Sequence, residues 1–320
     1  MTPHRDGKLA ALAPERTLRR LELQVTRRLD GLLNGEHLGL LPGPGTDLAE
    51  ARLYQPGEDD IRHMDWAVTA RTTTPHVRDL IADHELEAWA LTDLTPSMDF
   101  GTANLTKRDL AVAALAAVGF LTVRLGDRVG AYLLQPHQLR RWPARTGKAA
   151  MYALLQAILD ADTTPTGEPR DLAEGITALD RGQTRRGLRV IISDFLPHTP
   201  GTDHAPTWER PLRRLAARHQ VLAVEIIDPR ELDLPDIGLL EMTDPETGAT
   251  HDIVLNAKTR ARYAHAAAAQ REHTRTALRR CGAHHLILRT DRDWIADVAR
   301  FALRQRRAAG RTVTTTGARA

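Results

Sequence analysis

The sequence has little of the residue type that builds covalent and redox sites. Cys281 is the only cysteine among 320 residues. A single thiol excludes a disulfide within one chain, a thiolate zinc cluster and a redox pair of cysteines. The first sixteen residues carry charges but no apolar core, so we expect no signal peptide. Together these features predict a protein of the reducing cytoplasm.

Long hydrophobic runs and aromatic side chains are also scarce. The most apolar stretch, residues 110–123, is about fourteen residues long and falls short of the roughly twenty that cross a membrane. We therefore expect a buried helix there and no membrane span. Aromatic residues make up 4% of the chain, and its 44 basic and 41 acidic residues give a net charge of only +3. This composition gives no indication of a nucleic-acid partner.

Two aspartates, Asp93 and Asp194, each follow a short apolar run, at residues 88–92 and 188–193. Neither run alternates with polar residues, which is typical of parallel strands covered on both faces. Strands and helices then alternate along the chain, and Thr106 with Asp109 has the spacing of a helix-capping box. The pattern predicts an α/β fold with a doubly wound, mostly parallel sheet and an antiparallel edge near residues 139–142. Both aspartates should then lie side by side at the carboxyl edge of that sheet.

The first aspartate opens the string Asp93-Leu94-Thr95-Pro96-Ser97. One turn of chain thus supplies a carboxylate and the two hydroxyls of Thr95 and Ser97, and Asp194 adds a second carboxylate. Oxygen ligands of this kind suit Mg²⁺, so the set predicts a metal-ion-dependent adhesion site. The alternative is that both aspartates are ordinary turn residues that cap the following helices.

The chain before residue 86 has a different character. Residues 18–33 carry a helical apolar stripe, and residues 51–55 and 75–82 indicate a small antiparallel β segment. A charged cluster here surrounds Trp66 and comprises Asp59, Asp60, Arg62, Asp65, Arg71 and Arg78. It is either a recognition surface or a set of ion pairs that hold an irregular segment. We expect an amino-terminal segment over 1–85, the α/β domain over 86–305 and a disordered basic tail over 306–320.

The chain resembles a widespread bacterial family known as domain of unknown function fifty-eight, and the resemblance extends over nearly its whole length. It is carried by the string from Tyr54-Gln55-Pro56-Gly57 to Asp65-Trp66, by Gly126-Asp127-Arg128-Val129-Gly130, by the Asp93 string and by Ser193-Asp194-Phe195. The resemblance implies a von Willebrand factor A-like domain behind a short family-specific segment. It also implies a MoxR-type AAA+ ATPase as partner, because relatives are commonly encoded beside one.

Two positions depart from the family pattern. Thr95 stands where the family has serine, which keeps the hydroxyl. Arg170 stands where a threonine is expected before Asp171, unless Thr163, Thr164 or Thr166 takes that role. A guanidinium close to the site would repel Mg²⁺ and could pair with Asp93 or Asp194 in place of the ion.

Enzyme signatures are incomplete. Threonine occupies position 95, where a phosphoaspartyl phosphatase needs a second acid, and Gly147-Lys148 lacks the hydroxyl residue of a phosphate-binding loop. We therefore predict a non-enzymatic interaction module, an adaptor or co-chaperone of a MoxR-type AAA+ ATPase that acts on an unknown protein client. The alternative is a metal-dependent hydrolase at the same site. Replacing both aspartates by alanine should abolish partner binding and leave the fold intact.

Overall fold

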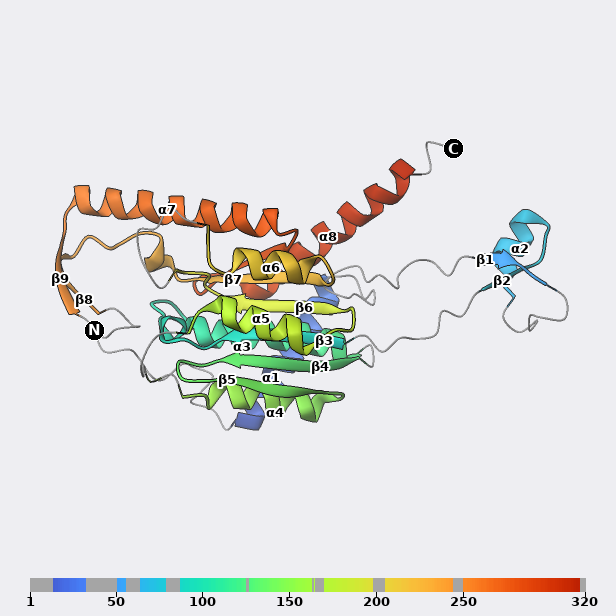
Figure 1. Ribbon diagram of the computed structural model, residues 1–320, viewed down its shortest axis with the longest axis horizontal. Coiled ribbons are helices and arrows are strands. Elements are labelled where there is room, and N and C mark those ends of the chain that lie inside the picture. Colours follow the sequence, from blue (N-terminus) through green and yellow to red (C-terminus); the bar gives the residue numbers. More distant parts are fainter. Residues whose placement is uncertain are drawn as a thin grey trace. The chain divides into compact units, whose positions relative to one another are not determined.

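The computed structural model describes residues 14–32, 51–55, 64–78, 87–124, 127–162, 164, 170–197, 205–243 and 250–316. The chain separates into two compact units. The larger unit comprises residues 1–38 and 86–303, and the smaller comprises residues 39–85 and 304–320. The larger unit contains the central sheet (Figure 1).

The central sheet has six strands in the order β10-β7-β6-β3-β4-β5. Their bounds are β3 (Glu87–Asp93), β4 (Arg128–Leu134), β5 (Leu139–Arg145), β6 (Leu188–Ser193), β7 (Gln220–Ile227) and β10 (His284–Arg289). Only β5 runs antiparallel to its neighbour in this sheet, and it lies at the edge. The predicted fold class, a doubly wound and mostly parallel sheet, is confirmed.

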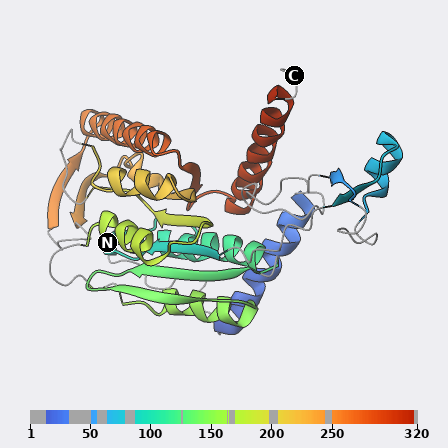
Figure 2. The ribbon, with the colours of Figure 1, turned by 45° about the vertical axis from the view of Figure 1, so that its right-hand side comes forward.

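Helices cover both faces of the sheet (Figure 2). On one face α1 (Pro14–Leu32), α3 (Lys107–Arg124) and α4 (Lys148–Leu159) contact one another. On the other, α5 (Leu172–Gly182) contacts α6 (Glu209–Ala216), which in turn contacts α7 (Ala257–Arg280). Residues 110–118 of α3 are all buried, as expected for a helix that is apolar on every side. None of the helices in the described ranges is long and apolar enough to cross a membrane.

Helix α1 packs on α3 and α4 through the predicted stripe, of which Leu18, Leu21, Val25 and Leu29 are buried. Its Glu22 accepts a hydrogen bond from the Tyr152 hydroxyl of α4. Residues 1–38 therefore group with the α/β domain, whereas the sequence placed them with the amino-terminal segment.

The smaller unit contains the predicted antiparallel segment. Strand β1 (Ala51–Leu53) pairs with β2 (His76–Arg78), and α2 (Trp66–Thr72) lies between them in the sequence. The Asp65 carboxylate accepts a hydrogen bond from the Val68 amide at 3.1 Å at the start of α2. Trp66 is 67% exposed. Asp65 therefore has a structural role in this unit.

Two further members of the predicted charged cluster lie within the described residues. Arg71 lies in the last turn of α2, and Arg78 ends β2. Asp59, Asp60 and Arg62 lie outside the described residues.

The carboxyl-terminal part adds a hairpin and two long helices. Strands β8 (Gly238–Thr243) and β9 (Thr250–Leu255) pair as an antiparallel hairpin, followed by α7. Helix α8 (Trp294–Thr316) continues beyond residue 305, so the segment expected to be a disordered tail is helical as far as Thr316. Arginine and alanine, which are common in this stretch, favour the helix.

Cys281 follows α7 directly and is buried. Its Sγ donates a hydrogen bond to the Glu209 carbonyl oxygen at 3.3 Å. Burial, together with the nearby Glu209 carboxylate, raises the pKa of the thiol to about 11. The thiolate is therefore disfavoured at neutral pH.

Candidate functional site

The two predicted aspartates lie side by side. Strands β3 and β6 pair in parallel with Thr92 opposite Ile192, so Asp93 lies next to Ser193, and Asp194 follows. The Ser193 hydroxyl donates a hydrogen bond to Asp93 Oδ2 at 2.7 Å. Both carboxylates are buried at the carboxyl edge of the sheet. This arrangement confirms the predicted geometry of the two strand ends.

The Asp93 string folds into a tight turn. Asp93 Oδ1 accepts hydrogen bonds from the Thr95 amide at 3.0 Å and from the Thr95 hydroxyl at 2.7 Å. The Thr95 and Ser97 hydroxyls lie 3.2 Å apart, and Ser97 contributes to lowering the pKa of Asp194. The four residues predicted as ligands therefore lie close together. The alternative, that Asp93 is a turn residue, also holds, because its carboxylate accepts the hydrogen bonds that form the turn.

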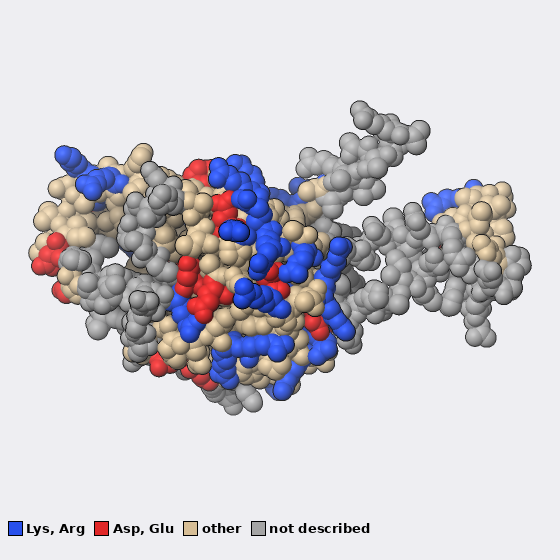
Figure 3. All heavy atoms as spheres, viewed as in Figure 1, with Lys and Arg blue, Asp and Glu red and all other residues tan. Residues whose placement is uncertain are grey.

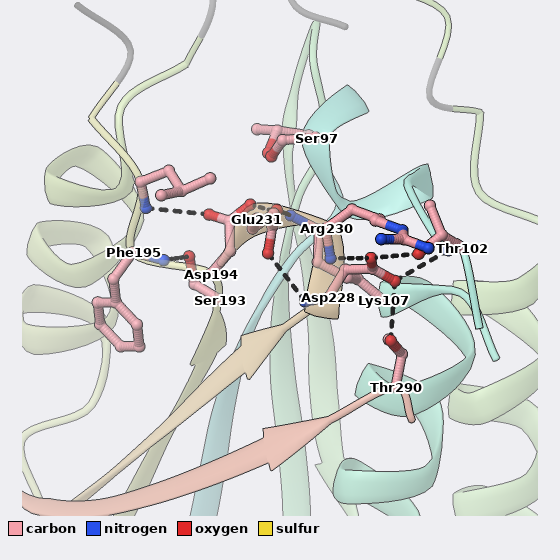
Figure 4. A network of polar contacts seen from close by, with 12 residues as sticks. Ser97, Thr102, Lys107, Ser193, Asp194, Phe195, Asp228, Arg230, Glu231 and Thr290 are labelled. Atoms are coloured by element: carbon pink, nitrogen blue, oxygen red, sulfur yellow. Dashed lines mark hydrogen bonds and ion pairs between the residues drawn. The ribbon is translucent and has the colours of Figure 1, made fainter. Parts of the chain in front are cut away.

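A lysine that the sequence did not single out lies at the centre of the site. Lys107 is the first residue of α3 and is 1% exposed. Its ammonium lies 2.8 Å from Asp194 Oδ2 and also pairs with Glu231 (Figure 4). The predicted capping box of Thr106 and Asp109 fixes the start of this helix through two reciprocal hydrogen bonds. The capping box therefore fixes the backbone position of Lys107 at the start of α3.

Glu231 reaches the site from the loop after β7. It ends the short 3₁₀ helix η3 (Pro229–Glu231), and its Oε2 accepts the Asp228 amide at 2.9 Å. The other oxygen, Oε1, accepts from Lys107. Glu231 is thus held by its own turn, in which it forms a capping box with Asp228, and by the ammonium. The spacing of Asp228 and Glu231 is a signal for this turn in the sequence, but it does not place the Glu231 carboxylate beside Lys107.

Asp228 is a neighbouring buried carboxylate with a structural role. Its two oxygens accept four hydrogen bonds, from the Thr102 amide and hydroxyl, the Arg230 amide and the Thr290 hydroxyl, at 2.6 to 2.9 Å. These donors come from the loop before α3, from η3 and from the residue after β10 (Figure 4). Asp228 therefore ties together the loops that surround the site.

The charges of the site are strongly coupled. Burial alone would raise the pKa of Asp194, but the Lys107 ammonium holds that pKa below its ordinary value. Burial, and then the negative charge of Asp194, raises the pKa of Asp93. Burial would lower the pKa of Lys107, yet Asp194 and Glu231 raise it. Lys107 and Asp194 therefore form a charged pair at neutral pH.

The donor set matches Mg²⁺ in type, but the space beside Asp194 is taken. Asp194 Oδ2 already accepts from the ammonium at 2.8 Å. At a separation of about 4 Å and an effective dielectric constant of about 20, an ammonium repels a divalent ion by about 8 kcal/mol. Among the residues the structure describes, no group of three or more His, Cys, Asp or Glu side chains is arranged to hold a metal ion. The residues present do not fit Mg²⁺ while Lys107 is in place.

Arg170, expected to be the residue that displaces the ion, lies elsewhere. Arg170 precedes α5, and its guanidinium pairs with Glu174 in the first turn of that helix and donates to the His137 carbonyl oxygen at 3.4 Å. The cation beside the aspartates is therefore Lys107 and not Arg170. Of the three threonines considered as substitutes, Thr164 donates to Asp162 at 2.7 Å, and Thr163 and Thr166 lie outside the described residues.

Basic side chains gather over α5 and α6 (Figure 3). The buried carboxylate of Asp180 pairs with both Arg214 and Arg218. These residues, with Arg181 and Thr184, line an open pocket of about 470 Å³. Because two guanidiniums share one carboxylate, the region keeps a positive charge.

Comparisons with known proteins agree with the sequence resemblance. The uncharacterised protein Rv1480 of Mycobacterium tuberculosis strain H37Rv is 51% identical over 304 residues, which cover 95% of this chain and 92% of that protein. The uncharacterised protein MAV169 of Mycobacterium avium is 47% identical over 171 residues, or 53% of this chain and 97% of that one.

Solved structures align at lower similarity. The conserved hypothetical protein BatB of Bacteroides thetaiotaomicron aligns with 15% identity and a TM-score of 0.38, covering 69% of this chain and 99% of that one. The VWA domain of SpRpn10 aligns with 12% identity and a TM-score of 0.34, covering 67% and 94%.

The family model described as protein of unknown function DUF58 matches residues 50–273. The chain therefore belongs to the DUF58 family.

Proposed function

We propose that this chain is a protein-interaction module that binds a partner through the two loops that follow β3 and β6. The observation that carries the proposal is that both loops present an exposed apolar side chain fixed to the buried polar site. Phe100 is 40% exposed and Leu196 is 43% exposed. Exposed apolar anchors beside a rigid polar core are typical of protein interfaces.

Both anchors are held by the residues of the site. The Leu196 amide donates to Asp194 Oδ1 at 3.1 Å. The Phe100 amide donates to the Ser97 carbonyl at 3.3 Å, and the Phe100 carbonyl accepts the Lys107 amide at 2.9 Å. A surface fixed in this way loses little conformational entropy on binding, which favours affinity. The polar site thus acts as the scaffold of the proposed interface.

The partner we propose is a MoxR-type AAA+ ATPase in the cytoplasm, with this chain as its adaptor or co-chaperone toward a protein client. The family resemblance supports this choice of partner. The metal-dependent hydrolase alternative has less support, because the Lys107 ammonium occupies the carboxylate oxygen that a catalytic ion would need. Partner contact through the loops themselves requires no chemistry at Asp93.

The test is a binding measurement between this chain and the MoxR-type ATPase of the same genome, by biolayer interferometry. We expect Phe100→Ser with Leu196→Ser to weaken binding at least tenfold, about 1.4 kcal/mol. The matched control is Leu239→Ser, which removes a side chain that is 65% exposed on β8. Equal affinity of the double variant and the wild type would reject the interface, and no binding by the wild type would reject the partner.

A further inference from the structure

We infer that the Lys107 ammonium permanently takes the place of the divalent cation at this site, so that the site works without metal. Three separate parts of the fold meet at this one side chain. Lys107 begins α3, Asp194 follows β6, and Glu231 ends η3 after β7. The ammonium therefore joins strand-end loops, as a bound ion would.

The position of Lys107 is costly unless the carboxylates require it. Removing an ammonium from water costs several kcal/mol, and a positive charge is disfavoured at the amino terminus of a helix. Lys107 has both disadvantages at 1% exposure. Ion pairs with Asp194 and Glu231 offset them. The side chain therefore stabilises the acidic site and contributes nothing favourable to its own helix end.

Every carboxylate oxygen of the aspartate pair already has a donor within the chain. Asp93 Oδ1 accepts from Thr95, and Asp93 Oδ2 accepts from Ser193. Asp194 Oδ1 accepts from Leu196, and Asp194 Oδ2 accepts from Lys107. Each of the four oxygens thus has at least one hydrogen-bond donor without an added ion. A divalent cation would have to displace the ammonium from Asp194 into a buried space with only Glu231 left to neutralise it.

The experiment is calorimetric titration with Mn²⁺, with free Mn²⁺ followed by electron paramagnetic resonance. We expect the wild-type chain to show no site tighter than about 1 mM, the weak end of protein sites for hard cations. Lys107→Met should gain a site at least tenfold tighter, because the carboxylates are left without a cation. Adding Asp194→Asn to Lys107→Met should remove that gain. The control is Lys148→Met, which removes a lysine whose side chain is 63% exposed.

Two outcomes overturn the inference. One is a wild-type chain that binds Mn²⁺ tightly or melts at a higher temperature with Mn²⁺ than with a chelator. The other is Lys107→Met that binds no tighter than the wild type. If Lys107→Met fails to fold, the double variant Lys107→Met with Glu231→Gln replaces it. This variant removes the charges of Lys107 and Glu231 together, keeps Asp194, and is judged by the same criteria. Metal binding is measured on this chain alone, so the result is independent of the partner proposed above.

Discussion

At the scale of single residues, Asp93 and Asp194 differ although they are neighbours. Asp194 neutralises the buried Lys107, so removing its charge leaves an ammonium with only Glu231. Breaking a buried ion pair costs about 3 kcal/mol or more. We expect Asp194→Asn to lower the free energy of unfolding by about 3 kcal/mol, measured by urea denaturation at pH 7. The expectation from the sequence, that both aspartates can be removed without loss of stability, changes for this reason.

Asp93→Asn is the matched variant. Burial and the charge of Asp194 raise the pKa of Asp93, so its ionised form is disfavoured in the native state. Neutralising it removes that penalty and retains the acceptor for Thr95, so we expect a loss well below that of Asp194→Asn. Equal losses in the two variants would contradict the assignment of Lys107 to Asp194.

His219 makes stability depend on pH. The ring is buried, and neither ring nitrogen has a hydrogen-bond partner among the described residues. Burial, and then the charges of Arg189 and Arg218, lowers its pKa from 6.5 to about 4. Below pH 6.5 the unfolded chain takes up a proton that the native chain takes up only near pH 4. The free energy of unfolding therefore decreases as the pH is lowered from 6.5 to 4.

The measurement compares urea unfolding of the wild type and His219→Phe at several values between pH 7 and pH 4. We expect the wild type to lose stability relative to the variant as the pH falls from 6.5 toward 4. The control is His273→Gln, which changes an exposed histidine on α7. A constant difference between wild type and His219→Phe over this range would show that His219 titrates normally.

At the scale of elements, two glycines differ in the side chain that a Cβ would meet: a fixed ring at Gly130 and a flexible chain at Gly119. A Cβ at Gly130 on β4 would lie 2.7 Å from the Trp89 ring, which packs against Tyr132 and Arg141. Because the ring cannot move away, we expect Gly130→Ala to cost about 1–3 kcal/mol. A Cβ at Gly119 in α3 would overlap the flexible Met151 side chain instead.

Gly119→Ala serves as the comparison. Methionine adapts its rotamers to such a change, and alanine favours a helix by about 1 kcal/mol over glycine. We therefore expect a smaller loss than for Gly130→Ala in the same thermal and urea measurements. A larger loss for Gly119→Ala would show that the contact between α3 and α4 is the more rigid one.

The sequence predicts the helices and strands more completely than it predicts the residues of the site. The apolar runs before Asp93 and Asp194 indicated β3 and β6, because buried parallel strands need apolar residues on both faces. The place of those two aspartates followed from the strand order. Lys107 could not be predicted, because the capping pattern around it fixes the helix start and not the direction of its side chain. Arg170 was misplaced because its position in the motif did not reveal the ion pair with Glu174.

At the scale of the whole molecule, residues 39–85 interrupt one unit of the chain. The residues before and after them, 1–38 and 86–303, form a single compact unit. Closing a loop with a flexible linker changes the entropy only slowly with length. We expect a chain with a glycine–serine linker of about 15 residues in place of 39–85 to retain a cooperative melt of the α/β unit, followed by circular dichroism.

The same excision locates the binding surface. If the shortened chain binds the ATPase with native affinity, the contact lies on the α/β unit, as proposed. If it folds and no longer binds, the segment with Asp65, Trp66 and Arg71 becomes the contact surface. Loss of the cooperative melt would show that residues 39–85 are part of the folded core.

The buried thiol of Cys281 makes the natural sequence a ready background for spectroscopic labelling. With a pKa near 11 and its Sγ enclosed beside Glu209, it reacts slowly with maleimides at neutral pH. A single cysteine introduced at Phe100 or Leu196, both exposed, would therefore take up a fluorophore or spin label selectively. The arrival of a partner at these loops can then be followed in the otherwise unaltered chain, without first replacing a core residue.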